Sequence, residues 1–143
     1  MSSNIQLDAF LDQHPGIEMF EVLLHDINGV QRGKWLPVDK IHKLFDGGFK
    51  MPLSSCSLDI WGRDLESLVS KTGDRDGICI PHASTLARVP WATRPTAQIV
   101  VSMTEEDTGA PYMGDVRAVL VNIAHRFKAL GLTPVVASEM EFH

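Results

Sequence analysis

The sequence predicts an α+β fold, in which a small sheet domain is followed by the first helix and strand of a second, truncated α/β domain. Three observations support this prediction. The 143 residues suffice for one domain and the start of another. Before residue 106, short alternating apolar segments are separated by turns, which is typical of strands. After residue 112, apolar residues recur at helical spacing.

The first predicted elements are a helix and a hairpin. Apolar residues lie at helical spacing within residues 4–13, and a Pro-Gly pair follows, which predicts an N-terminal arm over residues 1–16. The alternating stretch 20–27 predicts a strand. Asn28-Gly29 is the strongest short hairpin signal and predicts a return strand over residues 30–36.

The rest of the predicted sheet domain, residues 17–106, contains a helix and two further strands. Pro37 opens a helix over residues 38–45, which two glycines end. Residues 51–75 lack a clear period and are interpreted as an ordered loop region. Residues 77–81 and 98–104 are short apolar or alternating runs, which brings the expected strands to four.

A second domain is expected to begin within residues 112–143. Asp115 can cap a helix over residues 116–130 that ends at Gly131. Residues 133–142 then have the composition of a strand. Because such a strand needs neighbours on a sheet, we interpret this segment as the start of a longer α/β domain.

Composition excludes several classes of protein. Thirteen basic and eighteen acidic residues give a net charge of -5 without a basic run, so binding to nucleic acid or to an anionic membrane is not expected. The sequence lacks an apolar segment of membrane-spanning length and a signal peptide, so a cytoplasmic location is expected. Cys56 and Cys79 lie in apolar surroundings and are interpreted as reduced, buried thiols.

Two acidic residues near the end of the sequence form a candidate metal site. On a strand, Glu139 and Glu141 would leave the same face about 7 Å apart. If that face were partly buried, a divalent cation would remove their mutual repulsion, and carboxylate oxygens favour Mg²⁺ or Mn²⁺. A solvated strand face, on which the two charges repel only weakly, is the alternative.

Two aspartates are candidate catalytic residues. Asp59 lies next to Trp61, so its carboxylate could attract an ammonium group and take its proton while the indole ring offers a cation-π surface. Either Asp59 or Asp76 could instead be an ordinary loop residue that caps a turn. The sequence contains no complete phosphate-binding loop or nucleophile elbow. From the residues alone, therefore, no reaction is specified.

Five segments in the same order resemble the N-terminal part of the glutamine synthetase family. They are residues 23–37, 57–60, 76–81, 83–85 with 90–91, and 135–142. Two of them, Asp26-x-Asn28-Gly29-x-x-Arg32-Gly33-Lys34 and Leu58-Asp59-Ile60-x-Gly62, resemble the γ-glutamylpolyamine (γ-glutamylputrescine) synthetase branch. Bacterial glutamine synthetases carry Phe-Asp-Gly-Ser-Ser at the second of these positions, so only Asp59 is shared with them.

This resemblance implies a fold and an activity. It implies a β-grasp domain followed by the start of a catalytic domain. It also implies an ATP-dependent ligase that phosphorylates the γ-carboxylate of glutamate and transfers the acyl group to an amine, either putrescine-like or ammonia. Glu139 and Glu141 would bind Mg²⁺ or Mn²⁺. Asp59 would bind and deprotonate the amine, and Asp59 and Asp76 would reach the active site of a neighbouring subunit in a ring-shaped homo-oligomer.

The resemblance also leaves alternatives open. The family's nucleotide-binding and glutamate-binding residues match no part of this sequence, so the 143 residues are expected to be inactive alone and to belong to a longer reading frame. A glutamine synthetase that uses ammonia is one alternative. A β-grasp binding or assembly module without catalysis is another.

Overall fold

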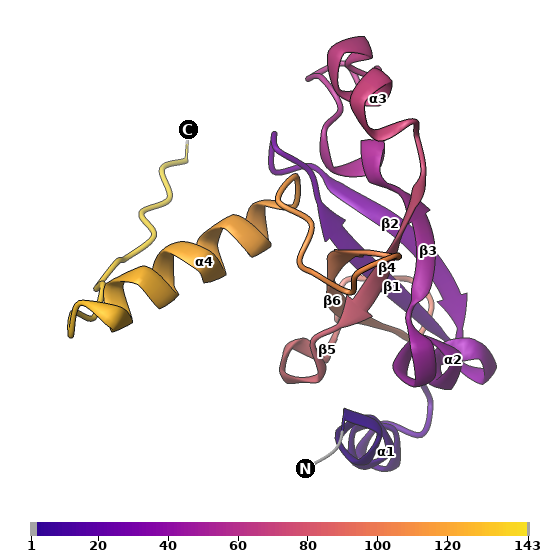
Figure 1. Cartoon of the computed structure of the whole chain (residues 1–143). Helices are drawn as coiled ribbons and strands as arrows, with labels where there is room; N and C mark the ends of the chain where they lie inside the picture. Colours follow the sequence, from indigo (N-terminus) through magenta and orange to yellow (C-terminus); the bar gives the residue numbers. More distant parts are fainter. Residues whose placement is uncertain (1–2, 143) are drawn as a thin grey trace.

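The computed structural model describes residues 3–142, apart from the side chains of residues 68, 70 and 72. Residues 1–2, which begin the predicted arm, and residue 143, the last of the predicted second domain, lie outside the described part. In chain order (Figure 1), the elements are α1 (Ser3–Gln13), β1 (Met19–His25), β2 (Gln31–Pro37), η1 (Val38–Lys40), α2 (Ile41–Gly47), β3 (Phe49–Pro52), η2 (Leu53–Cys56), α3 (Glu66–Thr72), β4 (Asp76–Pro81), η3 (Ala83–Thr85), β5 (Ala87–Arg88), β6 (Thr96–Glu105) and α4 (Val116–Ala129).

The strands form one mixed, curled sheet in the order β2-β1-β6-β4-β3, and the short β5 also pairs with β6. Neighbouring strands are antiparallel except for the central pair, because β1 runs parallel to β6 with Met19 opposite Thr96. The other pairs include the β1-β2 hairpin and the β3-β4 pair. The predicted α+β class is therefore confirmed, with a sheet of more strands than expected.

The hydrophobic core lies on one face of this sheet. Strand β1 alternates between half-buried and buried residues, as expected for a strand with one covered face. Its buried side chains pack with those of β6, and helices α1 and α2 cover them. The core comprises Leu7, Ile17, Phe20, Val22, Leu24, Ile41, Leu44, Met51, Leu53, Cys56, Cys79, Ala97, Ile99, Val101 and Met103.

Several predictions from the sequence are confirmed. The N-terminal helix ends at Gln13, and the Asn28-Gly29 turn joins two antiparallel strands. Helix α4 begins after Asp115, whose carboxylate accepts a hydrogen bond from the backbone N–H of Arg117 at 2.8 Å. Both cysteines are free and buried, and burial raises the pKa of each thiol to about 12.

The interpretation of residues 51–75 as a loop region was incomplete. This region contains the end of β3, the 3-10 turn η2 and the seven-residue helix α3. A four-residue strand is too short to show an alternating pattern, and α3 has a sequence that is too polar to show an apolar stripe. Pairing with β4, which is not visible in the sequence, stabilises β3.

The strand predicted for residues 133–142 is absent from the structure. These residues belong to no strand and are exposed, with exposed fractions of 91% for Val135 and 86% for Phe142. In the described part of the chain no neighbouring strand pairs with this segment, and without a partner an extended segment leaves its backbone groups to water. Figure 1 shows the segment turning back at the far end of α4 and running alongside that helix without joining the sheet.

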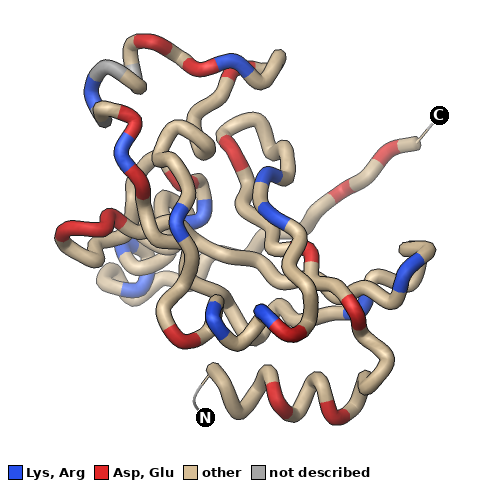
Figure 2. Tube along the Cα trace, turned by 90° about the vertical axis from the view of Figure 1, so that its right-hand side faces the viewer, with Lys and Arg blue, Asp and Glu red and all other residues tan. Residues whose placement is uncertain are grey.

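Helix α4 contacts the sheet only near its start. Ala118 is buried, whereas Val119, Leu120 and Phe127 of the predicted apolar stripe are at least 38% exposed. The helix is not a candidate for crossing a membrane, and the same holds for every other helix in the described residues. Lys and Arg are interspersed with Asp and Glu along the chain (Figure 2).

Glycine is required at position 33 of strand β2. Gly33 lies opposite Leu23 in the hairpin and has a φ of +140°. A Cβ atom on this residue would lie 1.8 Å from the backbone oxygen of Val22. The close approach of the two strands at this point therefore excludes any side chain.

We predict that Gly33→Ala lowers the free energy of unfolding by more than about 2 kcal/mol, because the new methyl group meets backbone that cannot move aside. The measurement is urea denaturation followed by circular dichroism. Gly16→Ala is the matched control, since a Cβ there meets nothing within 4 Å, and its effect should stay within about 1 kcal/mol. Equal effects of the two substitutions would contradict the prediction.

Candidate functional site

Asp59 lies in a tight turn between η2 and α3. Its Oδ1 accepts hydrogen bonds from the backbone N–H groups of Trp61 and Arg63, both at 2.8 Å. The backbone N–H of Asp59 donates to the carbonyl of Arg63, which closes the turn. The side chain thus caps a turn, as the structural alternative for Asp59 predicted. These bonds use only one carboxylate oxygen and leave Oδ2 for other contacts.

Two large apolar side chains that follow Asp59 in the chain are exposed on the surface. Ile60 and Trp61 directly follow Asp59 in the turn and are 71% and 76% exposed. As a residue, Asp59 is half-buried. A single negative charge next to an exposed indole ring can bind a cation through both charge and ring, so the surface of this turn suits an ammonium group.

The turn that contains Asp59 rests on the tip of the β1-β2 hairpin, and a buried carboxylate holds that tip. Asp26 is fully buried. Its Oδ1 accepts hydrogen bonds from the backbone N–H groups of Asn28 and Val30 at 2.8 and 2.9 Å. Its Oδ2 pairs with Nε of Arg32 at 2.9 Å. The carboxylate of Asp26 therefore bonds the backbone of the turn and also forms the ion pair with Arg32.

Burial alone would raise the pKa of Asp26. The hydrogen bonds from Val30, Arg32 and Asn28 and the charge of Arg32 outweigh burial, so the pKa lies below its usual value of 3.8. The carboxylate consequently stays ionised at neutral pH, where it holds the hairpin tip.

Asp76 is the first residue of β4, and no hydrogen bond or ion pair of the described residues links its side chain to Asp59. Its backbone pairs with Pro52 of β3, and its side chain is exposed. The hydrogen bond and charge of Glu106, and then the charge of Asp76, raise the pKa of Lys50. Asp76 is therefore accessible at the start of β4, and its charge acts on Lys50 of the neighbouring strand β3.

Glu139 and Glu141 lie in the segment after α4, and both side chains are exposed. Within residues 3–142, no group of three potential metal ligands from His, Cys, Asp and Glu comes together. No hydrogen bond or ion pair of the described residues links these glutamates to Asp59 or Asp76. The structure therefore does not bring the four predicted site residues together.

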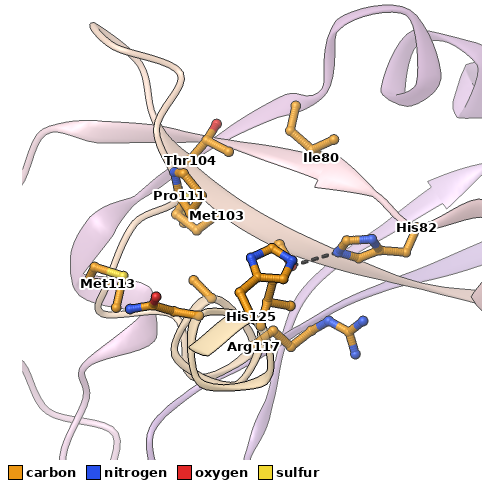
Figure 3. A pocket seen from close by; sticks show the side chains of 12 residues that line it. Ile80, His82, Met103, Thr104, Pro111, Met113, Arg117 and His125 are labelled. Carbon is orange, nitrogen blue, oxygen red and sulfur yellow. Dashed lines mark hydrogen bonds between the residues drawn. The ribbon is translucent and has the colours of Figure 1, made fainter. Parts of the chain in front are cut away.

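A cavity of about 510 Å³ lies between the sheet and the first turns of α4 (Figure 3). Ser102 and Thr104 line it from the face of β6 opposite the core, and Arg117 and His125 line it from α4. Nε2 of His82 lies 2.7 Å from Oγ of Ser102.

One of the two histidines that line this cavity, His82, is mainly neutral at pH 7. Burial, and then the nearby charge of Arg117, lowers the pKa of His82 below its usual 6.5. Sequence analysis did not identify this group of side chains, because His82 and Ser102 come from separate strand regions and have no recognisable spacing. The cavity is mainly apolar, and its polar side chains form no set of metal ligands.

The fold is that of glutamine synthetase-type structures. The chain superimposes on a structure described as a novel glutamine synthase homolog with a TM-score of 0.67, at 23% identity, over 80% of this chain and 27% of that one. It superimposes on a GmaS/ADP complex with a TM-score of 0.63, at 22% identity, over 91% of this chain and 26% of that one. No family model matches the sequence.

In sequence, the chain is similar to the gamma-glutamylputrescine synthetase PuuA of Escherichia coli (strain K12). The two sequences are 35% identical over an alignment 142 residues long, and the alignment covers 96% of this chain. The chain spans 29% of that relative's length. The resemblance to the N-terminal part of glutamine synthetase-type proteins, and to the γ-glutamylputrescine branch, is thereby confirmed.

We predict that Asp26→Asn destabilises the protein at pH 7 by about 1.5–3 kcal/mol, because a hydrogen bond to a charged group is lost. The folded-state pKa of Asp26 lies below the unfolded one, so its contribution is complete above about pH 4 and disappears as the pH falls through the folded pKa. Urea unfolding of both proteins should show a difference that narrows in acid. A difference that is constant between pH 7 and pH 2 would exclude this role.

Proposed function

We propose that these residues are the N-terminal part of an ATP-dependent ligase that joins the γ-carboxyl group of glutamate to an amine. The observation that carries the proposal is the 35% identity to a gamma-glutamylputrescine synthetase along 96% of the chain. The matched fold supports it, and so does the central parallel pair of β1 and β6 between two antiparallel pairs, which fits the β-grasp interpretation of residues 17–106.

In the proposed reaction, the γ-carboxylate of glutamate attacks the terminal phosphorus of ATP, which gives γ-glutamyl phosphate and ADP. The nitrogen of a neutral amine then attacks the acyl carbon, and phosphate leaves as the amide bond forms. An alkylamine is almost wholly protonated at pH 7, because its pKa is near 10.4. A base at the amine site is therefore needed for attack.

Asp59 is the proposed base. Its Oδ2 takes no part in the turn, and the exposed Trp61 beside it offers a surface for an organic ammonium group. The departure from the Phe-Asp-Gly-Ser-Ser of ammonia-dependent synthetases replaces two small residues, a glycine and a serine, with Ile60 and Trp61. This change favours a larger, putrescine-like acceptor over ammonia.

Glu139 and Glu141 are the proposed ligands of a divalent cation. Carboxylate oxygens are the donors that Mg²⁺ and Mn²⁺ prefer, and both side chains are accessible, so the chemistry of the donors fits. Two carboxylates do not fill a six-coordinate shell. A bound cation would neutralise negative charge on the phosphates of ATP and of the acyl phosphate.

Assembly is part of the same proposal. Asp59 and Asp76 both lie at the surface of the sheet domain, where a neighbouring subunit could receive them. We therefore propose a ring-shaped homo-oligomer in which these residues complete the site of an adjacent subunit that holds the metal. Residues 112–143 would begin the domain that contains that site.

We predict that Asp59→Asn in the complete gene product lowers amide formation by at least about 100-fold but leaves amine-independent ADP formation from ATP and glutamate within a few-fold. The amide oxygen of asparagine can still accept the bonds from Trp61 and Arg63, so the turn is kept. The measurement compares product formation with ADP release. Asp64→Asn, which removes a nearby charge, is the control. Equal loss of both steps would indicate a structural role.

The acceptor amine can be identified by competition. With the complete gene product, ATP and glutamate, putrescine should give a higher kcat/KM than ammonium, because the turn around Asp59 offers apolar contact to a carbon chain. The 143-residue polypeptide alone should give no amide with either amine. Preference for ammonium would favour a glutamine synthetase, and activity of the short polypeptide would contradict the proposed division of the site.

A further inference from the structure

We propose that the tip of the β1-β2 hairpin, residues 26–32, is a positioning element for the proposed base, with Asn28 as its principal contact. This inference rests on the proposed function and deepens it. In the sequence, the motif Asp26-x-Asn28-Gly29-x-x-Arg32-Gly33-Lys34 indicated a hairpin and a family resemblance, but no role for its side chains. In the structure, it also supports the turn that holds Asp59.

The first step is the bond made by Asn28. Its Nδ2 donates a hydrogen bond to the carbonyl of Leu58, with a distance of 2.7 Å. Leu58 directly precedes Asp59, so this bond fixes the peptide plane from which the carboxylate extends. The two residues are thirty positions apart in the sequence. The bond therefore links two segments that local structure alone would leave independent.

Two neighbouring contacts hold the same segments together. The backbone N–H of Ile27 donates to the carbonyl of Cys56 at 3.0 Å. At the other end of the turn, a Cβ atom on Gly62 would lie 3.8 Å from both terminal nitrogens of Arg32. The hairpin tip thus contacts the segment around Asp59 before, next to and after the carboxylate.

Hydrogen bonds within the hairpin tip itself restrict its movement. The buried carboxylate of Asp26 binds the backbone N–H groups of Asn28 and Val30, and the backbone N–H of Asp26 donates to the carbonyl of Val30 at 3.0 Å. Arg32 is held by the same carboxylate. Asn28 and Arg32 are consequently presented to the turn from a closed, internally bonded loop rather than from a free one.

A positioning role follows from this geometry. The side-chain N–H of Asn28 donates to the backbone carbonyl of Leu58, so Asn28 can act on Asp59 without touching a substrate. Its effect is to restrict the direction of the Asp59 carboxylate, whose Oδ2 must face an incoming amine. Small displacements of a catalytic group can cost up to about 100-fold in rate, so loss of this bond should be measurable in amine turnover.

The test uses Asn28→Asp in the complete gene product. Aspartate keeps the size of the side chain and favours the same turn, but it lacks the donor and places an oxygen against the carbonyl of Leu58. With putrescine, kcat should fall about 10-fold. With hydroxylamine, which is largely unprotonated at neutral pH and needs no base, kcat should change less than 2-fold. Hydrogen exchange of the backbone N–H groups of Trp61 and Arg63 should be faster than in the wild type.

Asn4→Ala is the matched control, because it removes the side-chain hydrogen bond of another asparagine, to Asp46, far from the hairpin in the sequence. It should leave both turnover numbers unchanged. Wild-type rates for Asn28→Asp with putrescine, or equal losses with both amines, would overturn the positioning role while the ligase proposal stands. If the wild-type protein forms no amide with any amine, the proposed function is wrong and the positioning role falls with it.

Discussion

The buried carboxylate of Asp26 is the interaction on which the hairpin and its surroundings depend. One side chain satisfies two backbone donors of the Asn28-Gly29 turn and the guanidinium of Arg32, without exposure to water. A buried charge is costly unless it is paired and hydrogen-bonded, so the turn and the ion pair stabilise each other. Close to this tip, β1 and β2 approach each other so closely at Gly33 that no side chain fits there.

The residues of the hairpin motif therefore have structural roles that can be stated one by one. Gly29 has a φ of +75°, which the turn requires. Nζ of Lys34 in β2 donates to the carbonyl of Lys50 in β3 at 3.3 Å and lies 5.2 Å from the ring centroid of Phe49. Lys34 therefore joins β2 to β3, the strand at the other end of the sheet. The proposed chemistry is assigned to Asp59, and the motif supplies the support on which the turn around Asp59 rests.

Local signals in the sequence were sufficient for elements that are stabilised locally. Asn28-Gly29 and the cap at Asp115 act over a few residues, and both were identified correctly. Strand β3 depends on pairing with β4, and the segment 133–142 depends on neighbours that residues 3–142 do not provide. Likewise, the sequence identified Asp59 through its resemblance to relatives, but the bond from Asn28 to Leu58 depends on the tertiary fold and has no signature in spacing.

The parallel pairing of β1 with β6 has a consequence for how the protein is made. Strand β1 acquires its second neighbour only after Thr96 and the residues that follow have left the ribosome. At about 5–20 residues per second, β1 waits for several seconds with one edge unpaired. During synthesis, the β1-β2 hairpin therefore presents an unpaired strand edge of the kind that pairs with other chains.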